Sequence, residues 1–202
     1  MSKNIDHPRR APARERLLAA AAELFYEEGF NIVGIDRVIE RAGVAKASLY
    51  DCFGSKEELI RAYLLARQQA RQARMTDGLM QYGTPRERLL GVFDVVGKLC
   101  AEPTFRGCPF VKAAAESRPG SSVNLVCDDA RLWLRDLFVR LATDAGASDP
   151  ATLAQQLVML HDGALISAQM DRNPGVVMLA RTMAAALLDA AAKPEGESPA
   201  GP

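Results

Sequence analysis

The stretch from Lys46 to Phe53, KASLYDCF, could read DNA from one face of a short helix. If Leu49 and Phe53 pack inward, the outer face of that helix carries small and polar side chains: Lys46, Ala47, Ser48, Tyr50 and Asp51. Side chains of this kind let a helix sit deep in a DNA major groove, which is about 12 Å wide. The stretch is therefore a candidate recognition helix.

A second short helix is expected directly before it. Residues 35–42 carry apolar side chains at helical spacing, and Gly43 closes the pattern before a tight turn over 43–45. Two short helices joined in this way have the dimensions of a DNA-binding helix-turn-helix. An ordinary helical hairpin has the same dimensions, so spacing alone leaves both interpretations open. In either case the residues expected to be buried are Ile35, Val38, Ile39, Val44, Leu49 and Phe53.

The flanking sequence predicts an all-α chain. One helix is expected from Pro12 to Gly29, and another from Ser55 towards Gly78, with Ser55 and Glu58 spaced as a capping box. Proline and glycine breakers separate the remaining expected helices. These run at about 85–101, 109–118, 122–145, 150–171 and 175–192.

Composition excludes several classes of protein. The 202 residues are 49% hydrophobic, which suits a globular chain, and their zero net charge excludes a uniformly basic nucleic-acid binder. No uncharged apolar run approaches the length of a membrane span, and no secretory signal is visible, so we expect a cytoplasmic protein without membrane contact. The four cysteines form no CxxC pair. We therefore expect neither a structural zinc site nor any other metal or cofactor.

Three sequence motifs together resemble the N-terminal domain of the tetracycline-repressor (TetR/AcrR) family of transcriptional regulators. They are A-x-x-L-F-x-x-x-G-F at Ala21–Phe30, I-x-x-V-x-x-x-A-G-V at Ile35–Val44 and K-x-S-L-Y-x-x-F-x-S-K-E-E-L at Lys46–Leu59. The resemblance implies a three-helix DNA-binding domain followed by a larger helical domain for ligand binding and dimerisation. The expected parts are a mobile basic arm (1–14), the helix-turn-helix domain (15–56), the effector and dimer domain (57–192) and a disordered tail (193–202).

This resemblance implies a homodimer that binds a palindromic double-stranded DNA operator and responds to a small-molecule effector. The residues expected to contact DNA are Arg14, Gly34, Arg37, Ala45, Lys46, Ala47, Ser48, Tyr50, Asp51, Ser55 and Lys56. Gly34 stands where the family usually has a capping Thr or Ser, and Ala45 replaces a frequent Ser. Asp51 could accept from a cytosine amino group, although pairing with a nearby basic side chain is favoured. The basic arm is either a solvated tail or a further DNA contact.

The C-terminal half offers a candidate effector pocket of bulky apolar side chains with a few polar groups. The residues expected to line it are Phe93, Val96, Phe105, Cys108, Phe110, Val111, Trp133, Met159, His161, Asp162, Leu165 and Gln169. His161 could bind a carboxylate ligand or be a packing histidine, and the second is favoured. Asp162 could instead pair with an arginine.

Small and apolar residues on the last two expected helices predict the dimer interface. They are Leu160, Ala164, Ser167, Ala168, Ala180, Met183, Ala184 and Leu187, and packing within one subunit is the alternative. A thiol- or metal-sensing regulator is a second hypothesis. The candidate thiol sensors are Cys108, near Arg106, and Cys52, on the recognition helix, and a metal would need Cys108 with His161, although structural cysteines are favoured. An enzyme is disfavoured because no nucleophile and base, phosphate loop or metal motif is present.

Overall fold

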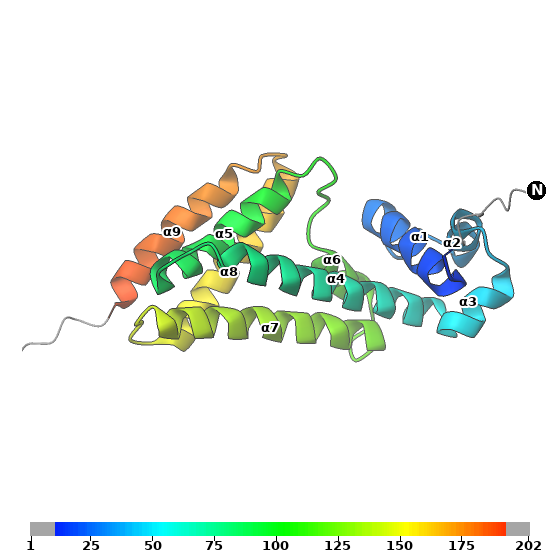
Figure 1. Cartoon of the computed structure of the whole chain (residues 1–202), viewed down its shortest axis with the longest axis horizontal. Helices are drawn as coiled ribbons and strands as arrows, with labels where there is room; N and C mark the ends of the chain where they lie inside the picture. Colours follow the sequence, from blue (N-terminus) through cyan, green and yellow to red (C-terminus); the bar gives the residue numbers. More distant parts are fainter. Residues whose placement is uncertain (1–10, 193–202) are drawn as a thin grey trace, which may run out of the picture. The chain divides into compact units, whose positions relative to one another are not determined.

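A computed structural model describes residues 11–192 of the chain, and this part contains nine α-helices and no named strand (Figure 1). The helices are α1 (Ala13–Glu28), α2 (Ile35–Ala42), α3 (Lys46–Phe53), α4 (Lys56–Leu79), α5 (Pro85–Cys100), α6 (Pro109–Glu116), α7 (Ser122–Asp144), α8 (Pro150–Met170) and α9 (Val176–Ala191). Each predicted helix is found, with ends close to those expected. The all-α prediction is confirmed.

The described chain divides into two compact units. The N-terminal unit comprises the residues up to Ala66 together with Lys112–Val126, and the C-terminal unit comprises Arg67–Val111 and the residues from Cys127 onward. The expected boundary after residue 56 followed the linear sequence, whereas the units divide α4, α6 and α7 between them. The expected basic arm lies largely outside the described residues, although Ala13 and Arg14 belong to α1. The expected tail, 193–202, lies entirely outside them.

Three aromatic rings form the centre of the N-terminal unit. Phe25, Phe30 and Tyr63 are buried, and their ring centroids lie 5.5–6.0 Å apart. Such tilted and edge-on arrangements place positive ring edges against negative ring faces. Leu17 and Leu49 are also fully buried, and α1 packs against both α2 and α3.

The turn between α2 and α3 depends on a left-handed residue. Gly43 adopts φ 60° and ψ 48°, a conformation that glycine reaches without a Cβ clash. The guanidinium of Arg16 donates to the carbonyls of Ala42 and Gly43, at 2.9 and 2.8 Å. Arg16 thereby satisfies carbonyls that the end of α2 leaves without a helical partner.

The C-terminal unit has one continuous apolar core in which α5, α8 and α9 pack together. Phe93 and Phe138 are fully buried at its centre, with ring centroids 6.1 Å apart. A capping box at the start of α5 joins Thr84 and Glu87. None of the helices in the described residues is long and apolar enough to cross a membrane.

Candidate DNA-binding surface and effector site

The outer face of α3 is polar, and its inner face is buried. Leu49 and Phe53 lie in the core, whereas Lys46, Ala47 and Asp51 are exposed and Tyr50 is 46% exposed. The orientation predicted for α3 is confirmed, and DNA contact through this face stays a prediction.

The buried set predicted for α2 and the turn needs correction. Val38 is buried, but Ile35, Ile39 and Val44 are only half-buried. The core instead takes Phe30 and Val33 from the connection between α1 and α2. Periodicity within the two short helices could not show this, because the connection itself has no helical pattern.

Helices α2 and α3 both begin without a side-chain cap. Their N-cap residues are Gly34 and Ala45, both exposed, and neither offers a side-chain acceptor to the first N–H groups of its helix. Uncapped N–H groups at a helix N-terminus are ready to bind phosphate oxygens. The departures from the family pattern at these positions therefore leave backbone donors open.

Two predicted DNA-contact cations are already paired within the N-terminal unit. Lys46 Nζ lies 3.1 Å from Asp36 Oδ1, and the hydrogen bond raises the pKa of Lys46. Arg37 forms two hydrogen bonds with Glu28, which raise the pKa of Arg37 and lower the pKa of Glu28. Asp51 has no ion pair among the described residues, so the favoured pairing with a basic neighbour is not found within them.

Only one of the two hydrogen bonds of the predicted capping box forms at the start of α4. The Glu58 N–H donates to Ser55 Oγ at 3.1 Å, but the Glu58 carboxylate faces Arg61 instead of completing the box. Lys56 is half-buried, and burial lowers its pKa despite the opposing effect of Glu116. Arg14 lies over the ring of Phe53, with its Cζ 5.1 Å from the ring centroid.

In the C-terminal unit, the guanidinium of Arg71 lies between two aromatic rings. Its Cζ is 4.8 Å from the centroids of both Phe110 and Trp133, and Nη2 donates to the Ala130 carbonyl at 2.6 Å. Its Nε is buried without a hydrogen-bond partner among the described residues. Burial lowers the pKa of Arg71 to about 10, so the group is cationic at neutral pH. Arg71 was not among the residues predicted to line an effector site, because no local pattern in α4 links it to Phe110 and Trp133.

His161 and Asp162 form a polar pair beside this site. His161 is 4% exposed, its Nδ1 lies 3.2 Å from Asp162 Oδ1, and its ring meets Phe138 edge-on. Arg131 pairs with the other carboxylate oxygen. Burial raises the pKa of Asp162, but the hydrogen bonds from His161 and Arg131 outweigh burial, and the net shift is downward. These contacts favour the packing interpretation of His161 and the arginine-paired interpretation of Asp162.

The other predicted effector residues do not share one surface. Phe93, Val96 and Leu165 are buried in the packed core and Phe110 is buried against Arg71, whereas Val111 and Met159 are exposed. Phe105 and Gln169 line a separate cavity of about 630 Å³ together with Cys100, Glu102, Arg106 and Arg172. Cys108 and Trp133 are half-buried beside the core.

The predicted dimer residues are mostly packed inside the subunit. Ala164, Ala168, Ala180 and Ala184 are buried where α8 meets α9, and Leu160, Ser167 and Leu187 are half-buried. Small residues were expected between subunits, but here they allow these two helices of one subunit to approach closely. Of the predicted set only Met183 is exposed.

A different set of apolar side chains is exposed on the last two helices. We call it the methionine face: Met159, Ile166 and Met170 on α8, and Met178, Leu179 and Met183 on α9. On α8, residues 159, 163, 166 and 170 follow helical spacing, and this signal could have been found in the sequence.

The four cysteines fall into two classes. Cys100 and Cys127 are buried, and burial raises the pKa of each thiol to about 11, whereas Cys52 and Cys108 are half-buried. No group of three metal-ligating side chains occurs within residues 11–192.

Comparison with known proteins identifies the family. The family model of bacterial regulatory proteins of the tetR family matches residues 17–63. NemR of Escherichia coli K12, an HTH-type transcriptional repressor, is 31% identical over 158 residues, which cover 77% of this chain and 70% of NemR.

Solved structures agree with this relationship over most of the chain. The TetR-family transcriptional regulator SCO4454 of Streptomyces coelicolor has a TM-score of 0.85 and 31% identity, covering 90% of this chain and 96% of its own. The reduced form of E. coli NemR has a TM-score of 0.74 and 26% identity, covering 86% of this chain and 95% of its own. These relatives are transcriptional regulators and not enzymes, as the sequence predicts. With its helix-turn-helix of α2 and α3 and its larger C-terminal helical domain, the chain belongs to the TetR family of bacterial transcriptional regulators.

Proposed function

We propose that this regulator is a cytoplasmic repressor that binds a palindromic operator as a homodimer and leaves it when a small effector binds. The observation that carries the proposal is the exposed polar face of α3, flanked by the uncapped N-termini of α2 and α3. Side chains on that face can reach base edges, and the open N–H groups can bind phosphates on either side. The repressor assignment follows the name of NemR.

The methionine face supports a homodimer. Exposed apolar side chains on two neighbouring helices lose water contact when a second copy covers them, and methionine packs well against irregular surfaces. A two-fold dimer would present two copies of α3 to half-sites about 34–36 Å apart.

The surroundings of Arg71 support an effector site in the C-terminal unit. The free Nε of Arg71 can donate to a ligand acceptor, while the rings of Phe110 and Trp133 provide flat apolar surfaces. An effector that binds better to the form unable to span two half-sites would release the operator, because its differential affinity shifts the equilibrium.

Two measurements test this proposal. Selection of genomic fragments by the purified chain should enrich one palindrome, and recovery of no common sequence from a folded dimer would contradict operator recognition. In sedimentation, Ile166→Glu should yield monomers because it places a charge on the methionine face. Leu125→Glu changes a comparably exposed residue of α7 outside that face and should leave the dimer intact. A dimeric Ile166→Glu variant would exclude this interface.

A thiol-responsive regulator is the second candidate function, because Cys108 acts electrostatically on Arg71 and is half-buried. Oxidation of a thiol requires access to it, and Cys108 is less buried than Cys100 and Cys127. One solved structure of NemR is of its reduced form. Under this hypothesis oxidant releases the wild-type chain from its operator but not the Cys108→Ser variant. Equal release of the wild type and the Cys108→Ser variant would show that the response does not depend on Cys108.

A further inference from the structure

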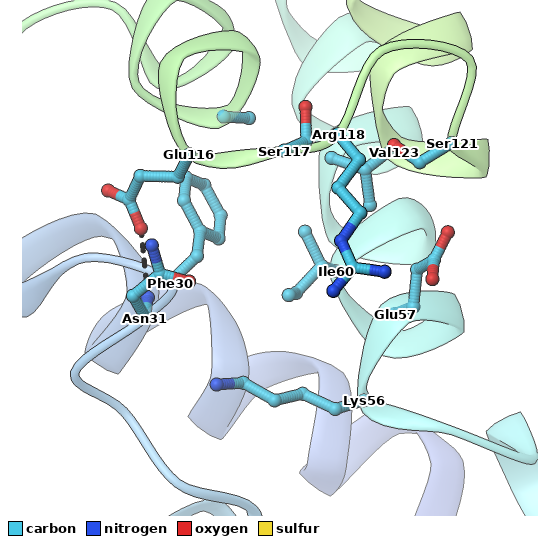
Figure 2. A pocket seen from close by; sticks show the side chains of 11 residues that line it. Phe30, Asn31, Lys56, Glu57, Ile60, Glu116, Ser117, Arg118, Ser121 and Val123 are labelled. Carbon is cyan, nitrogen blue, oxygen red and sulfur yellow. Dashed lines mark hydrogen bonds between the residues drawn. The ribbon is translucent and has the colours of Figure 1, made fainter.

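A cavity of about 340 Å³ lies within the N-terminal unit, separate from the effector site around Arg71. It is bounded by the α1–α2 connection, the first turn of α4 and the segment joining α6 to α7 (Figure 2). This volume lies in the range of pockets that bind small organic molecules.

The apolar part of the cavity comes from side chains that are already ordered by the fold. Phe30 belongs to the aromatic cluster with Phe25 and Tyr63, Ile60 lies on α4, and Val123 lies near the start of α7. All three are largely buried. The apolar body of a ligand could rest on these side chains without first ordering them, so little entropy would be lost.

The two carboxylates that line the cavity, Glu116 and Glu57, already accept hydrogen bonds. Glu116 Oε2 accepts the Asn31 N–H at 2.8 Å, the contact drawn as a dashed line in Figure 2. Glu57 Oε1 accepts both the N–H and the Oγ–H of Ser122, at 3.1 and 2.8 Å. These acids therefore serve as partners for backbone donors of the α1–α2 connection and of α7.

The two cations of the cavity have no such acceptors. The side chains of Lys56 and Arg118 form no hydrogen bond or ion pair with any of the described residues, although Glu116 acts on Lys56 electrostatically. In Figure 2, Lys56 extends along the side of the cavity nearest the first turn of α4, and Arg118 reaches in from the opposite side. An arginine fork and an ammonium on opposite walls suit one carboxylate between them.

We propose that this cavity binds a small amphipathic carboxylate, with Lys56 and Arg118 holding the charged group and Phe30, Ile60 and Val123 covering the apolar body. The ligand would engage the ammonium of Lys56, a residue also expected to contact operator phosphate. Carboxylate and DNA would then compete for the same cation, so this site would oppose DNA binding without involving Arg71. This site goes beyond the effector-release proposal because it lies in the unit that contains α3.

Calorimetry on the full-length chain tests the site with 4-phenylbutyrate as the probe and 4-phenylbutanamide as its uncharged match. The acid should bind at least about tenfold more tightly than the amide, because only the acid can form charge-assisted hydrogen bonds with both Lys56 and Arg118. Arg118→Gln should weaken acid binding by about tenfold or more and leave amide binding unchanged. Arg118 is exposed, so this variant should keep the wild-type circular dichroism spectrum.

Arg61→Gln provides the matched control, since Arg61 is an exposed arginine of α4 that does not line the cavity. It should bind the acid as the wild type does. Equal affinity for acid and amide, no acid binding up to about 10 mM, or unchanged binding in Arg118→Gln would each overturn the proposal. Inorganic phosphate binding as tightly as the acid would overturn the requirement for an apolar body.

Discussion

Both terminal nitrogens of Arg37 bind the carboxylate of Glu28, with Nη1–Oε2 and Nη2–Oε1 distances of 2.6 and 2.8 Å. This two-point contact joins α2 to the last turn of α1. A guanidinium held in this way has fewer free donors for phosphate than the sequence suggested. Arg37 is therefore better described as fixing the position of α2 than as a direct DNA contact.

The salt dependence of operator binding should separate Arg37 from Lys56. Each phosphate contact adds about 0.9 to the slope of log affinity against log salt concentration. Lys56→Ala should reduce the magnitude of that slope by about one, whereas Arg37→Ala should leave it near the wild-type value. Titrations at several salt concentrations give both slopes. A matching reduction in Arg37→Ala would show that Arg37 exchanges Glu28 for phosphate.

Removing the ring of Tyr50 should weaken operator binding with little effect on folding. Tyr50 is 46% exposed on α3, so Tyr50→Ala removes little buried surface. Loss of a specific contact to DNA typically costs about 1–3 kcal/mol, which is about tenfold to a hundredfold in affinity. Binding titrations measure the affinity, and thermal melts followed by circular dichroism measure stability. A Tm lowered by about 10 °C or more would instead assign Tyr50 to the core.

Asp162 should make the stability of the chain depend on acid pH. Its pKa is lower in the folded chain than in the unfolded chain, so the unfolded state binds the proton more readily. The stabilisation is complete above about pH 5 and is lost as the pH falls through the folded pKa. Melting curves from pH 7 to 3 should fall less steeply for Asp162→Asn. Asp171→Asn, which removes an exposed acid after α8, should follow the wild-type curve.

Two glycines of α5 should respond oppositely to replacement by alanine. A Cβ on Gly91 would lie 2.3 Å from the Tyr82 ring, which donates its hydroxyl to Asp94 at 2.9 Å. Gly91→Ala should therefore reduce the free energy of unfolding by about 1–3 kcal/mol through overpacking. A Cβ on Gly97 would meet Val177 at 3.8 Å, an ordinary contact, so Gly97→Ala should gain up to about 1 kcal/mol. Urea titration measures both, and a stabilised Gly91→Ala would show that the ring moves freely.

Local signals were sufficient to predict the helices and the orientation of α3. Apolar spacing, Gly43 and the Ser55 cap act within a few residues, so each could be interpreted without knowledge of the fold. Tyr50 and Leu49 could be assigned to opposite faces for the same reason. The family resemblance then gave the order of the domains.

Long-range packing decided what the sequence could not show. Ala180 and Met183 lie on the same short helix, but only the packing of α8 on α9 determines that the first is buried and the second exposed. Likewise Arg71 and Trp133 are distant in the chain, and the fold alone places the guanidinium against the ring. The Lys56–Arg118 cavity joins residues from three segments, which no local pattern connects.

The methionine face makes a second oxidisable surface on this regulator. Four of its six side chains are thioethers, and Met159 and Met170 are 72% and 77% exposed. Conversion of a thioether to a sulfoxide replaces a flexible apolar group with a polar one. An oxidant could thus separate the proposed subunits even in a chain without cysteine, and methionine sulfoxide reductase would restore them. Reversal by that enzyme would indicate that methionine oxidation had separated the subunits. Reversal by a thiol reductant alone would indicate chemistry at Cys108.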